Sequence, residues 1–195
     1  MGDVPLPDWV FPPPGGFTAD VFLRMRGLPR HTELIDGSLV FVSPQRKWHV
    51  RVINLIRAEL DRQAPEGLRA DREMAVRLAE RQVPEPDVLL VTRDAYEREE
   101  PATYYELQDV VLVLEAVSPD SIDRDRDTKP HKYATAGIKH FWRVEDDDGR
   151  TVVYVYELDP ATGCYGLTGI HHDALKVTVP FDIDIDLTAL GRRGR

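Results

Sequence analysis

Apolar positions along the chain follow two patterns, one typical of helices and one typical of strands. From Trp48 to Leu60 they recur at helical spacing, which predicts an amphipathic helix over residues 45–63. Residues 83–92, which contain Asp87, and residues 110–117 each include an apolar run, and two strands are predicted there. The second run is apolar at almost every position, a pattern typical of a central strand that is covered on both faces.

Turn-forming residues mark where further elements begin and end. An Asp-Gly pair at 36–37 separates two apolar runs and predicts a β-hairpin. A Ser-Pro pair at 43–44 predicts the N-cap and the first turn of the helix that follows. Pro130 and Gly137 predict the first turn and the end of a second helix.

Beyond this second helix, the sequence is typical of short strands that turns separate. Consecutive strands this closely spaced are expected to be antiparallel. The predicted strands span residues 140–144, 151–158, 165–168 and 175–179. Together the elements predict an α+β fold of an α/β/α-like kind, with a central mixed sheet, flanking helices and extra antiparallel strands at the C-terminal end.

Chain length and local composition predict the domain organisation. A chain of 195 residues is expected to fold as one domain. Residues 1–16 contain five prolines and three glycines, which predicts an extended N-terminal arm. Residues 17–190 are expected to form the single domain, and residues 191–195 a short basic tail.

Composition argues against a membrane protein and against a secreted one. No apolar run approaches the roughly 18 residues that a transmembrane helix needs. The N-terminus lacks the basic and apolar segments of a signal peptide. The lone Cys164 cannot form an internal disulfide. A cytoplasmic location without a membrane partner is therefore expected.

The charge balance is acidic, with a net charge of −9. This argues against broad electrostatic adhesion to nucleic acid, but a cluster of metal-binding carboxylates would also concentrate negative charge. Basic residues do gather near the start of the chain and in the predicted helix, where a solvated helix face is the simpler interpretation.

Two carboxylates and a lysine are the first candidates for chemistry. Asp87 and Glu115 each occupy an apolar segment, where an unpaired charge would be costly. With the backbone carbonyl of Ala116 as a third ligand, they could bind Mg²⁺, which prefers oxygen ligands. Lys129 could then orient an attacking water or stabilise charge on a phosphate. The simpler alternative is that both acids form ion pairs with arginines.

Other sites are less well supported by the residues. The acidic run from Asp123 resembles the start of a calcium loop, but Thr128 and Ala134 replace the glycine and the glutamate that such a loop requires. The single cysteine argues against a zinc site. His49, on the inner flank of the predicted helix, is most simply a partly buried histidine with satisfied hydrogen bonds.

Several short motifs occur in a fixed order along the chain. They are Glu33–Gly37, Ser43-Pro44, His49, Pro86-Asp87, Glu115–Pro119, Asp125–Lys129, Tyr133 and Gly137–Val144. This order resembles the Uma-type putative restriction endonucleases, over roughly residues 20–160. The resemblance implies membership of the PD-(D/E)XK nuclease superfamily and a restriction-endonuclease-like sheet with a Mg²⁺-dependent phosphodiesterase site, in which Mn²⁺ is a possible substitute.

The resemblance also implies roles for individual residues. Asp87 and Glu115 correspond to the metal-binding acids. The superfamily's usual lysine would stand at Val117, and Lys129 on the following helix is implied to supply the ammonium instead. Glu33 corresponds to an additional N-terminal acid. Further supporting positions that match the family are His49, Asp125 and Tyr133.

Three functions compete at this point. The first is a Mg²⁺-dependent endonuclease that hydrolyses DNA, and nucleases of this type often cut both strands as homodimers. The second is a catalytically weak or inactive nuclease-fold protein that acts as a binding or regulatory module. A third, glycoside hydrolysis by two carboxylates, requires a defined separation between them.

Overall fold

The computed structural model describes residues 11–42 and 45–190. The predicted basic tail and the Ser-Pro helix cap at 43–44 lie outside the described residues, as do residues 1–10 of the predicted arm. Among the described residues, no helix is both long and apolar enough to cross a membrane.

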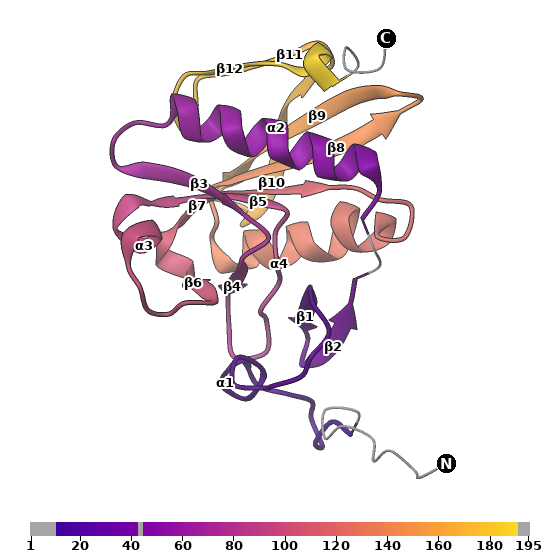
Figure 1. The fold of residues 1–195 in the computed structure, drawn as a ribbon, viewed down its shortest axis with the longest axis vertical. Helices are drawn as coiled ribbons and strands as arrows, with labels where there is room; N and C mark the ends of the chain where they lie inside the picture. Colours follow the sequence, from indigo (N-terminus) through magenta and orange to yellow (C-terminus); the bar gives the residue numbers. More distant parts are fainter. Residues whose placement is uncertain (1–10, 43–44, 191–195) are drawn as a thin grey trace.

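A six-stranded mixed sheet forms the centre of the molecule, as the sequence predicted (Figure 1). Its strand order is β10-β9-β8-β7-β5-β3. Only β7 and β8 run parallel, and every other neighbouring pair is antiparallel. The strands are β3 (Leu68–Arg72), β5 (Val88–Thr92), β7 (Val110–Ala116), β8 (His140–Asp147), β9 (Arg150–Asp159) and β10 (Cys164–His171).

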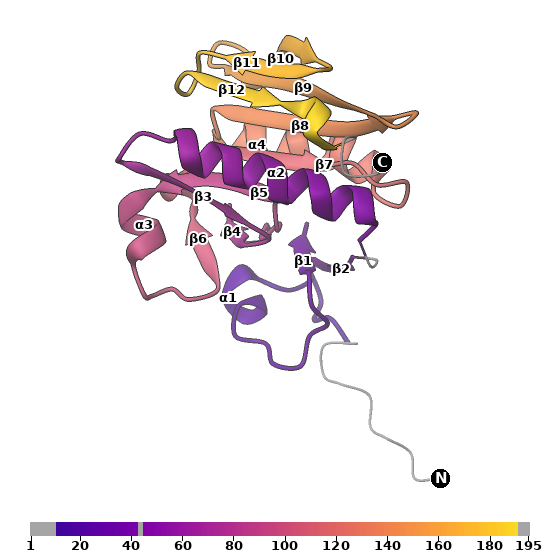
Figure 2. The same ribbon diagram turned by 45° about the horizontal axis from the view of Figure 1, so that its top comes forward.

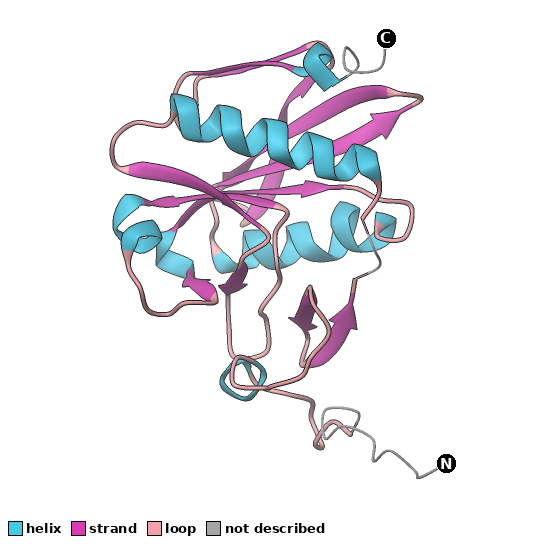
Figure 3. Ribbon diagram, viewed as in Figure 1, coloured by secondary structure: helices cyan, strands magenta, loops and turns pink. Residues whose placement is uncertain are grey.

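Helices cover both faces of this sheet (Figure 3). Helix α2 (Lys47–Gln63) packs its apolar side on one face, and this layer buries Ile53 and Ile56 against Leu114. A π-helical turn, η3 (Arg124–Thr128), runs into α4 (Lys129–Ala136), which lies on the opposite face. The second apolar layer forms between α4 and the sheet. Its members include Val113, Tyr133 and Phe141.

An N-terminal hairpin packs beside the sheet on the α4 side. Strands β1 (Thr32–Ile35) and β2 (Ser38–Phe41) pair antiparallel, which confirms the predicted hairpin. Asp36 and Gly37 both have positive φ angles, 52° and 79°, as a two-residue type I′ turn requires. A bridge between Leu34 and Val83 ties β1 to the segment that precedes β5.

Smaller elements complete the domain (Figure 2). The short strands form two further pairs, β4 with β6 in parallel and β11 with β12 antiparallel. These elements are α1 (Ala19–Phe22), β4 (Ala75–Arg77), α3 (Arg93–Glu97), β6 (Tyr104–Glu106), η2 (Leu107–Asp109), β11 (Ala174–Val177), β12 (Ile183–Asp186) and η4 (Leu187–Leu190).

One predicted strand is shorter than expected. The apolar run at 83–92 becomes strand only from Val88, so Asp87 precedes β5 instead of lying within it. Val83 hydrogen bonds with Leu34 of the hairpin, and the prolines at 84 and 86 have no N–H to donate to a sheet. The segment therefore pairs with the hairpin at Val83 and joins the central sheet only at Val88.

Candidate active site

The candidate site lies at the C-terminal end of β7. Side chains of a strand alternate between its faces. Leu112 and Leu114 pack in the α2 layer, whereas Val113 packs in the α4 layer. Glu115 shares the face of Val113 and is buried, with 1% exposure. A carboxylate is therefore placed under the start of α4.

Lys129, the first residue of α4, meets this carboxylate. Its Nζ lies 2.9 Å from Oε2 of Glu115 and 2.8 Å from Oε1 of Glu33, and it donates to the carbonyl of Glu85 at 3.3 Å. Sequence resemblance implied that a helix-borne lysine would stand beside the acid of β7, and the two groups are in direct contact. Lys129 is itself buried, with 4% exposure.

Tyr133 lies one helical turn after Lys129 and binds the other oxygen of Glu115. Its hydroxyl donates to Oε1 at 2.5 Å. Residues four positions apart share one side of a helix, which explains why both groups reach the same carboxylate. Both oxygens of Glu115 are thus hydrogen bonded to α4.

Glu33 comes to the site from β1 of the hairpin. Its Oε1 also accepts a hydrogen bond from the backbone N–H of Glu85 at 2.8 Å. Its Oε2 is buried and has no hydrogen-bond partner, and it lies 3.8 Å from Nε of Arg124. The hairpin therefore adds a fully buried carboxylate beside Lys129.

Asp87 is held by two groups on different elements. Its Oδ1 lies 3.0 Å from Nε2 of His49 on α2, and its Oδ2 accepts the backbone N–H of Ala116 at 2.7 Å. The second bond joins the segment before β5 to the end of β7. Nδ1 of His49 is buried and has no hydrogen-bond partner. The simple interpretation of His49 as fully satisfied is therefore not what the structure shows.

Asp125 belongs to η3, the turn that leads into α4. Its side chain is buried and lines the same pocket as Asp87 and Glu115. Burial raises the pKa of Asp125, although the charge of Lys129 opposes this effect. The acidic run that resembled a calcium loop therefore forms a helical turn with one inward carboxylate.

Burial and charge shift the acid–base behaviour of the central pair in defined directions. Complete burial raises the pKa of Glu115 well above its usual value, with Lys129 acting against the shift. For Lys129, burial acts to lower the pKa, but the carboxylates of Glu115 and Glu33 outweigh it and hold the pKa well above its usual value. Lys129 is therefore a firmly protonated ammonium.

His49 is also shifted towards its charged form. Burial acts to lower its pKa, but the hydrogen bond to Asp87 and the charge of that carboxylate outweigh the burial, so the pKa of His49 is raised. A protonated His49 donates one hydrogen bond to Asp87 and keeps a second N–H for another acceptor.

A small polar pocket opens onto these groups, with a volume of about 30 Å³. This is enough for one or two water-sized occupants. The pocket is lined by the predicted site residues His49, Asp87, Glu115, Ala116, Asp125 and Lys129. Tyr133 and Glu33 contact Glu115 and Lys129 from behind it.

The donor chemistry of the pocket fits a hard cation. Asp87, Glu115 and Asp125 supply carboxylate oxygens, the ligands that Mg²⁺ prefers. Each carboxylate oxygen has two lone pairs, so an oxygen that already accepts one hydrogen bond can still bind a metal. Among the described residues, no three His, Cys, Asp or Glu side chains are arranged as they stand to hold a metal.

Two contributors to the site had no signal in the sequence. His31, with a positive φ of 57°, places Nδ1 2.6 Å from Oε1 of Glu85 at the edge of the pocket. Arg124 lies beside Glu33. Neither residue was predicted to belong to the site, and their contacts depend on how the hairpin docks on the sheet.

Comparison with solved structures supports the same kind of fold. A crystal structure of a putative nuclease of Anabaena variabilis ATCC 29413, belonging to DUF820, superimposes with a TM-score of 0.64. The two sequences are 18% identical, and the match covers 84% of this chain and 89% of that one. A search of curated proteins found no match.

Comparison with protein families assigns most of the chain to one of them. The model of the Uma2 family, described as putative restriction endonuclease, matches residues 19–189. The match includes both strand-end acids, the lysine of α4 and the N-terminal hairpin. The chain therefore belongs to the Uma2 family.

Proposed function

We propose that this protein is a Mg²⁺-dependent endonuclease of the PD-(D/E)XK type that hydrolyses phosphodiester bonds in DNA. The observation that carries the proposal is the 2.9 Å contact between Nζ of Lys129 and Oε2 of Glu115. Val117 stands where the superfamily usually has its lysine. Lys129 of α4 brings an ammonium to the Glu115 carboxylate instead. The family match and the nuclease-like neighbour support the proposal.

Asp87 and Glu115 are the proposed metal ligands, with the carbonyl of Ala116 as a third. When bound, Mg²⁺ would polarise a phosphoryl oxygen and lower the pKa of a coordinated water. Mn²⁺ has the same preference for oxygen ligands and is a possible substitute.

Lys129 is proposed to orient the attacking water and to stabilise negative charge on the phosphate. Its raised pKa keeps it protonated, so it acts through its positive charge and not as a base. Tyr133 and Glu33 hold this ammonium and the Glu115 carboxylate in place. His49 fixes the direction of the Asp87 carboxylate through its 3.0 Å contact.

A cleavage assay tests the proposal. Supercoiled plasmid and single-stranded circular DNA would be incubated with Mg²⁺, Mn²⁺ or EDTA, and nicked, linear and degraded products separated by electrophoresis. We expect cleavage by the unaltered protein that EDTA abolishes. Glu115→Gln and Asp87→Asn are each expected to reduce the rate by about 100-fold or more.

Asp109→Asn is the matched control. Asp109 is a buried carboxylate paired with Arg98 at 2.5 Å, and it directly precedes β7. It therefore lies at the opposite end of the strand from Glu115, roughly 20 Å away at the usual rise per residue. Cleavage that survives Glu115→Gln as well as Asp109→Asn would contradict the assignment of the site.

The second candidate function is a nuclease-fold binding module without catalysis. One observation favours it: both oxygens of Glu115 already accept hydrogen bonds, from Tyr133 and Lys129. A thermal-shift titration separates the two functions. The nuclease proposal expects Mg²⁺ or Mn²⁺ to raise the melting temperature, and expects Asp87→Asn to abolish the rise.

Two further properties accompany the proposed nuclease. A homodimer would place two sites on one duplex, so linear product that appears without accumulation of nicked plasmid would support it. A reducing, cytoplasmic compartment is proposed because Cys164 is free and exposed.

A further inference from the structure

A row of basic and aromatic side chains crosses the sheet away from the candidate site. Glu115 of β7 is the register partner of Arg143 of β8, and Arg143 is the partner of Tyr154 of β9. Register partners share a face, and neighbouring strands are about 4.8 Å apart, so Tyr154 lies roughly 10 Å from Glu115 across the sheet. The row begins at the carboxylate site and runs outwards.

Arg143 is held between two tyrosine rings in this row. The centre of its guanidinium lies 4.5 Å from the ring centroid of Tyr154 and 5.6 Å from that of Tyr156. Tyr156 in turn packs on Phe141, with 5.5 Å between their ring centroids, and Phe141 packs on Tyr165 at 5.4 Å. Arg143 and Phe141 thus join the half-buried rings of Tyr154, Tyr156 and Tyr165 into one aromatic platform.

The platform continues onto the edge strand as an exposed apolar surface. Leu167 is the register partner of Tyr156, and Ile170 is the partner of Tyr154. An irregularity between Leu167 and Gly169 lets both aliphatic side chains share the tyrosine face. Both are 50% exposed, so this part of the sheet is open to solvent.

Pockets that share residues connect the platform with the carboxylate site. A pocket of about 210 Å³ contains Arg126, Arg143 and Tyr156. A neighbouring pocket of about 220 Å³ also contains Arg126, together with His49 and Ser118. His49 and Ser118 both line the carboxylate pocket too. The shared residues therefore place the three pockets next to one another, in a series from the platform to the acids, which we call the path.

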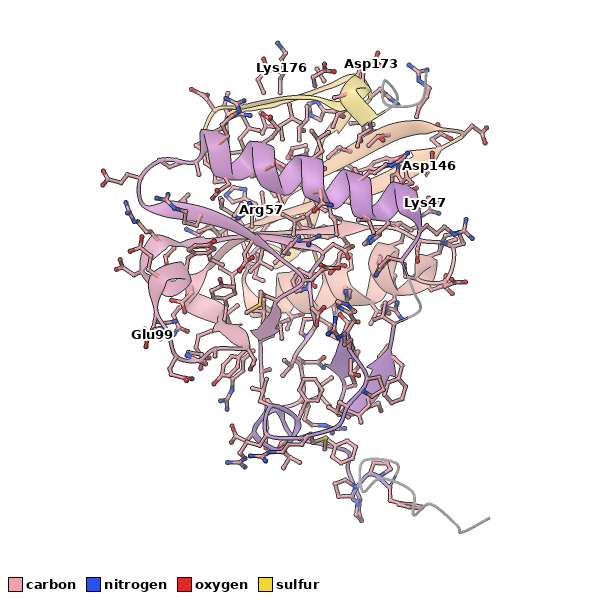
Figure 4. All side chains as sticks on the ribbon, in the orientation of Figure 1. Lys47, Arg57, Glu99, Asp146, Asp173 and Lys176 are labelled. Carbon is pink, nitrogen blue, oxygen red and sulfur yellow. The ribbon has the colours of Figure 1, made fainter. Side chains whose placement is uncertain are left out.

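The second of these pockets lies where α2 begins and β8 ends. It contains Arg46, which precedes α2, and Asp146 of β8. Figure 4 labels Lys47 and Asp146, which lie on the same side of the molecule. Arg46 therefore borders the path at the start of α2.

Local charge along the path differs from that of the whole chain. Arg126 and Arg143 both pair with Glu145, so two guanidinium groups share one carboxylate. Asp127 and His131 also line the groove beside them. Arg46, Arg126 and Arg143 are matched in number by Asp127, Glu145 and Asp146, so the path is neutral in a chain whose net charge is −9.

We infer that this path binds a single-stranded stretch of nucleic acid and leads it to the carboxylate pocket. A base would stack on Tyr154, next to the packed rings of Tyr156 and Phe141, and phosphates would contact Arg126 and Arg143. Aromatic side chains interleaved with arginines are the usual means of holding unpaired bases, whereas a duplex hides its base faces. The inference rests on the proposed nuclease function for its substrate, but its binding step requires neither metal nor cleavage.

Fluorescence anisotropy of labelled 12-nucleotide oligothymidylate, measured in EDTA, tests the inference. Tyr154→Leu keeps an apolar side chain but removes the ring, and it should weaken binding by about 5- to 100-fold, while Tyr154→Phe should bind as the unaltered protein does. Tyr96→Leu is the control, because Tyr96 is 39% exposed on α3, outside the path. Thermal unfolding checks that each variant is folded.

Salt dependence adds a second measurement. Two phosphate contacts would give a slope of about −1.4 for the logarithm of affinity against the logarithm of salt concentration, and Arg143→Gln should reduce its size by about half. Oligouridylate of the same length distinguishes RNA from DNA as the source of the strand.

Several outcomes would overturn the inference. The first is that the unaltered protein and Tyr154→Leu bind oligothymidylate with equal affinity. The second is that a blunt duplex binds more tightly than the single strand. The third is that Tyr154→Leu loses self-association and keeps its DNA binding. Failure of the nuclease proposal looks different, since ring-dependent binding would then persist in a protein that cuts nothing. Conversely, if Tyr154→Leu cleaves DNA at the same rate as the unaltered protein, the strand-binding inference fails and the nuclease proposal stands.

Discussion

Lys129 is the residue on which the buried charges of the site depend. Its ammonium contacts Glu33 at 2.8 Å and Glu115 at 2.9 Å, and all three side chains are almost completely buried. A buried ion pair need not stabilise a fold relative to apolar residues, but the loss of one partner is costly because the other charge remains unpaired. The effect of a substitution on stability here therefore depends on how many buried charges it leaves unpaired, and not only on the contact that it removes.

Replacement of Lys129 by methionine is expected to destabilise the protein by about 3–5 kcal/mol, because two buried carboxylates would lose their counter-ion. Addition of Glu115→Gln to this variant should restore part of the loss, since one uncompensated charge is removed. The free energy of unfolding would be measured by urea denaturation in EDTA.

Lys132→Met is the control for this experiment. Lys132 lies on the same helix and pairs with Asp36, whose side chain is 61% exposed. A surface pair of this kind contributes about 0–1 kcal/mol. If Lys132→Met and Lys129→Met lower the free energy of unfolding by similar amounts, the loss comes from changing any lysine of α4. The argument from buried charges would then fail.

The pair of His49 and Asp87 predicts a pH dependence of stability. Burial opposes the charge on His49, but Asp87 outweighs it and raises the pKa above 6.5. The paired histidine therefore contributes stability fully below pH 6.5, and this contribution is lost as the pH rises through the folded-state pKa.

His49→Gln should remove this pH-dependent contribution. The difference in the free energy of unfolding between the unaltered protein and His49→Gln is expected to be largest below pH 6.5 and to shrink at higher pH. Urea denaturation in EDTA at a series of pH values measures it. A difference that is constant between pH 5 and 9 would mean that His49 does not change its protonation on unfolding.

At the level of elements, the sequence was most informative where a local rule decides the structure. The helix over 47–63, the hairpin turn at 36–37 and the end of α4 at Gly137 follow from apolar spacing, turn preference and capping. Each of these depends on a few neighbouring residues.

The sequence was less informative where distant segments compete for the same backbone. Strand β5 is shorter than its apolar run because Val83 pairs with Leu34 of the hairpin. His31 and Arg124 join the site through the same docking. Neither contact follows from local propensity, and both require knowledge of which segments lie side by side.

The C-terminus of α4 gives a prediction at this scale. Gly137 has a φ of 88°, and a Cβ there would meet no atom within 4 Å, so Gly137→Ala would add backbone strain without a clash. It is expected to destabilise the protein by about 1–2 kcal/mol. Urea denaturation measures the change.

Gly67→Ala is the matched substitution, because Gly67 also has open space around it but no positive φ. It should leave the free energy of unfolding unchanged or raise it by up to about 1 kcal/mol. Equal losses at the two glycines would indicate that the helix end does not depend on the left-handed conformation.

At the scale of the whole molecule, two apolar layers lie on opposite faces of the central sheet, and a smaller third cluster packs α1 against the hairpin. Strands β7 and β8 contribute fully buried side chains to both layers, whereas edge strand β10 has several exposed ones. Stability against local opening is therefore expected to decrease from the middle of the sheet towards β10.

Hydrogen exchange measured by mass spectrometry or NMR tests this gradient. Backbone amides of residues 112–116 and 141–144 should exchange the slowest, and those of residues 164–171 much faster. The proposed strand-binding path crosses this boundary, so oligothymidylate should slow exchange in β9 and β10. Uniform protection across the sheet would contradict the gradient.

The contacts of Lys129 differ widely in the length of chain that they close. Lys129 reaches Glu115 across 14 residues and Glu85 across 44, and Glu85 reaches Glu33 across a further 52. Longer loops cost more entropy to close, so β7 and α4 are expected to associate early in folding and the hairpin to dock late. During synthesis on the ribosome, hairpin residues 32–41 are made long before Lys129. The candidate site can therefore be completed only after synthesis has passed Tyr133, about two thirds of the way along the chain.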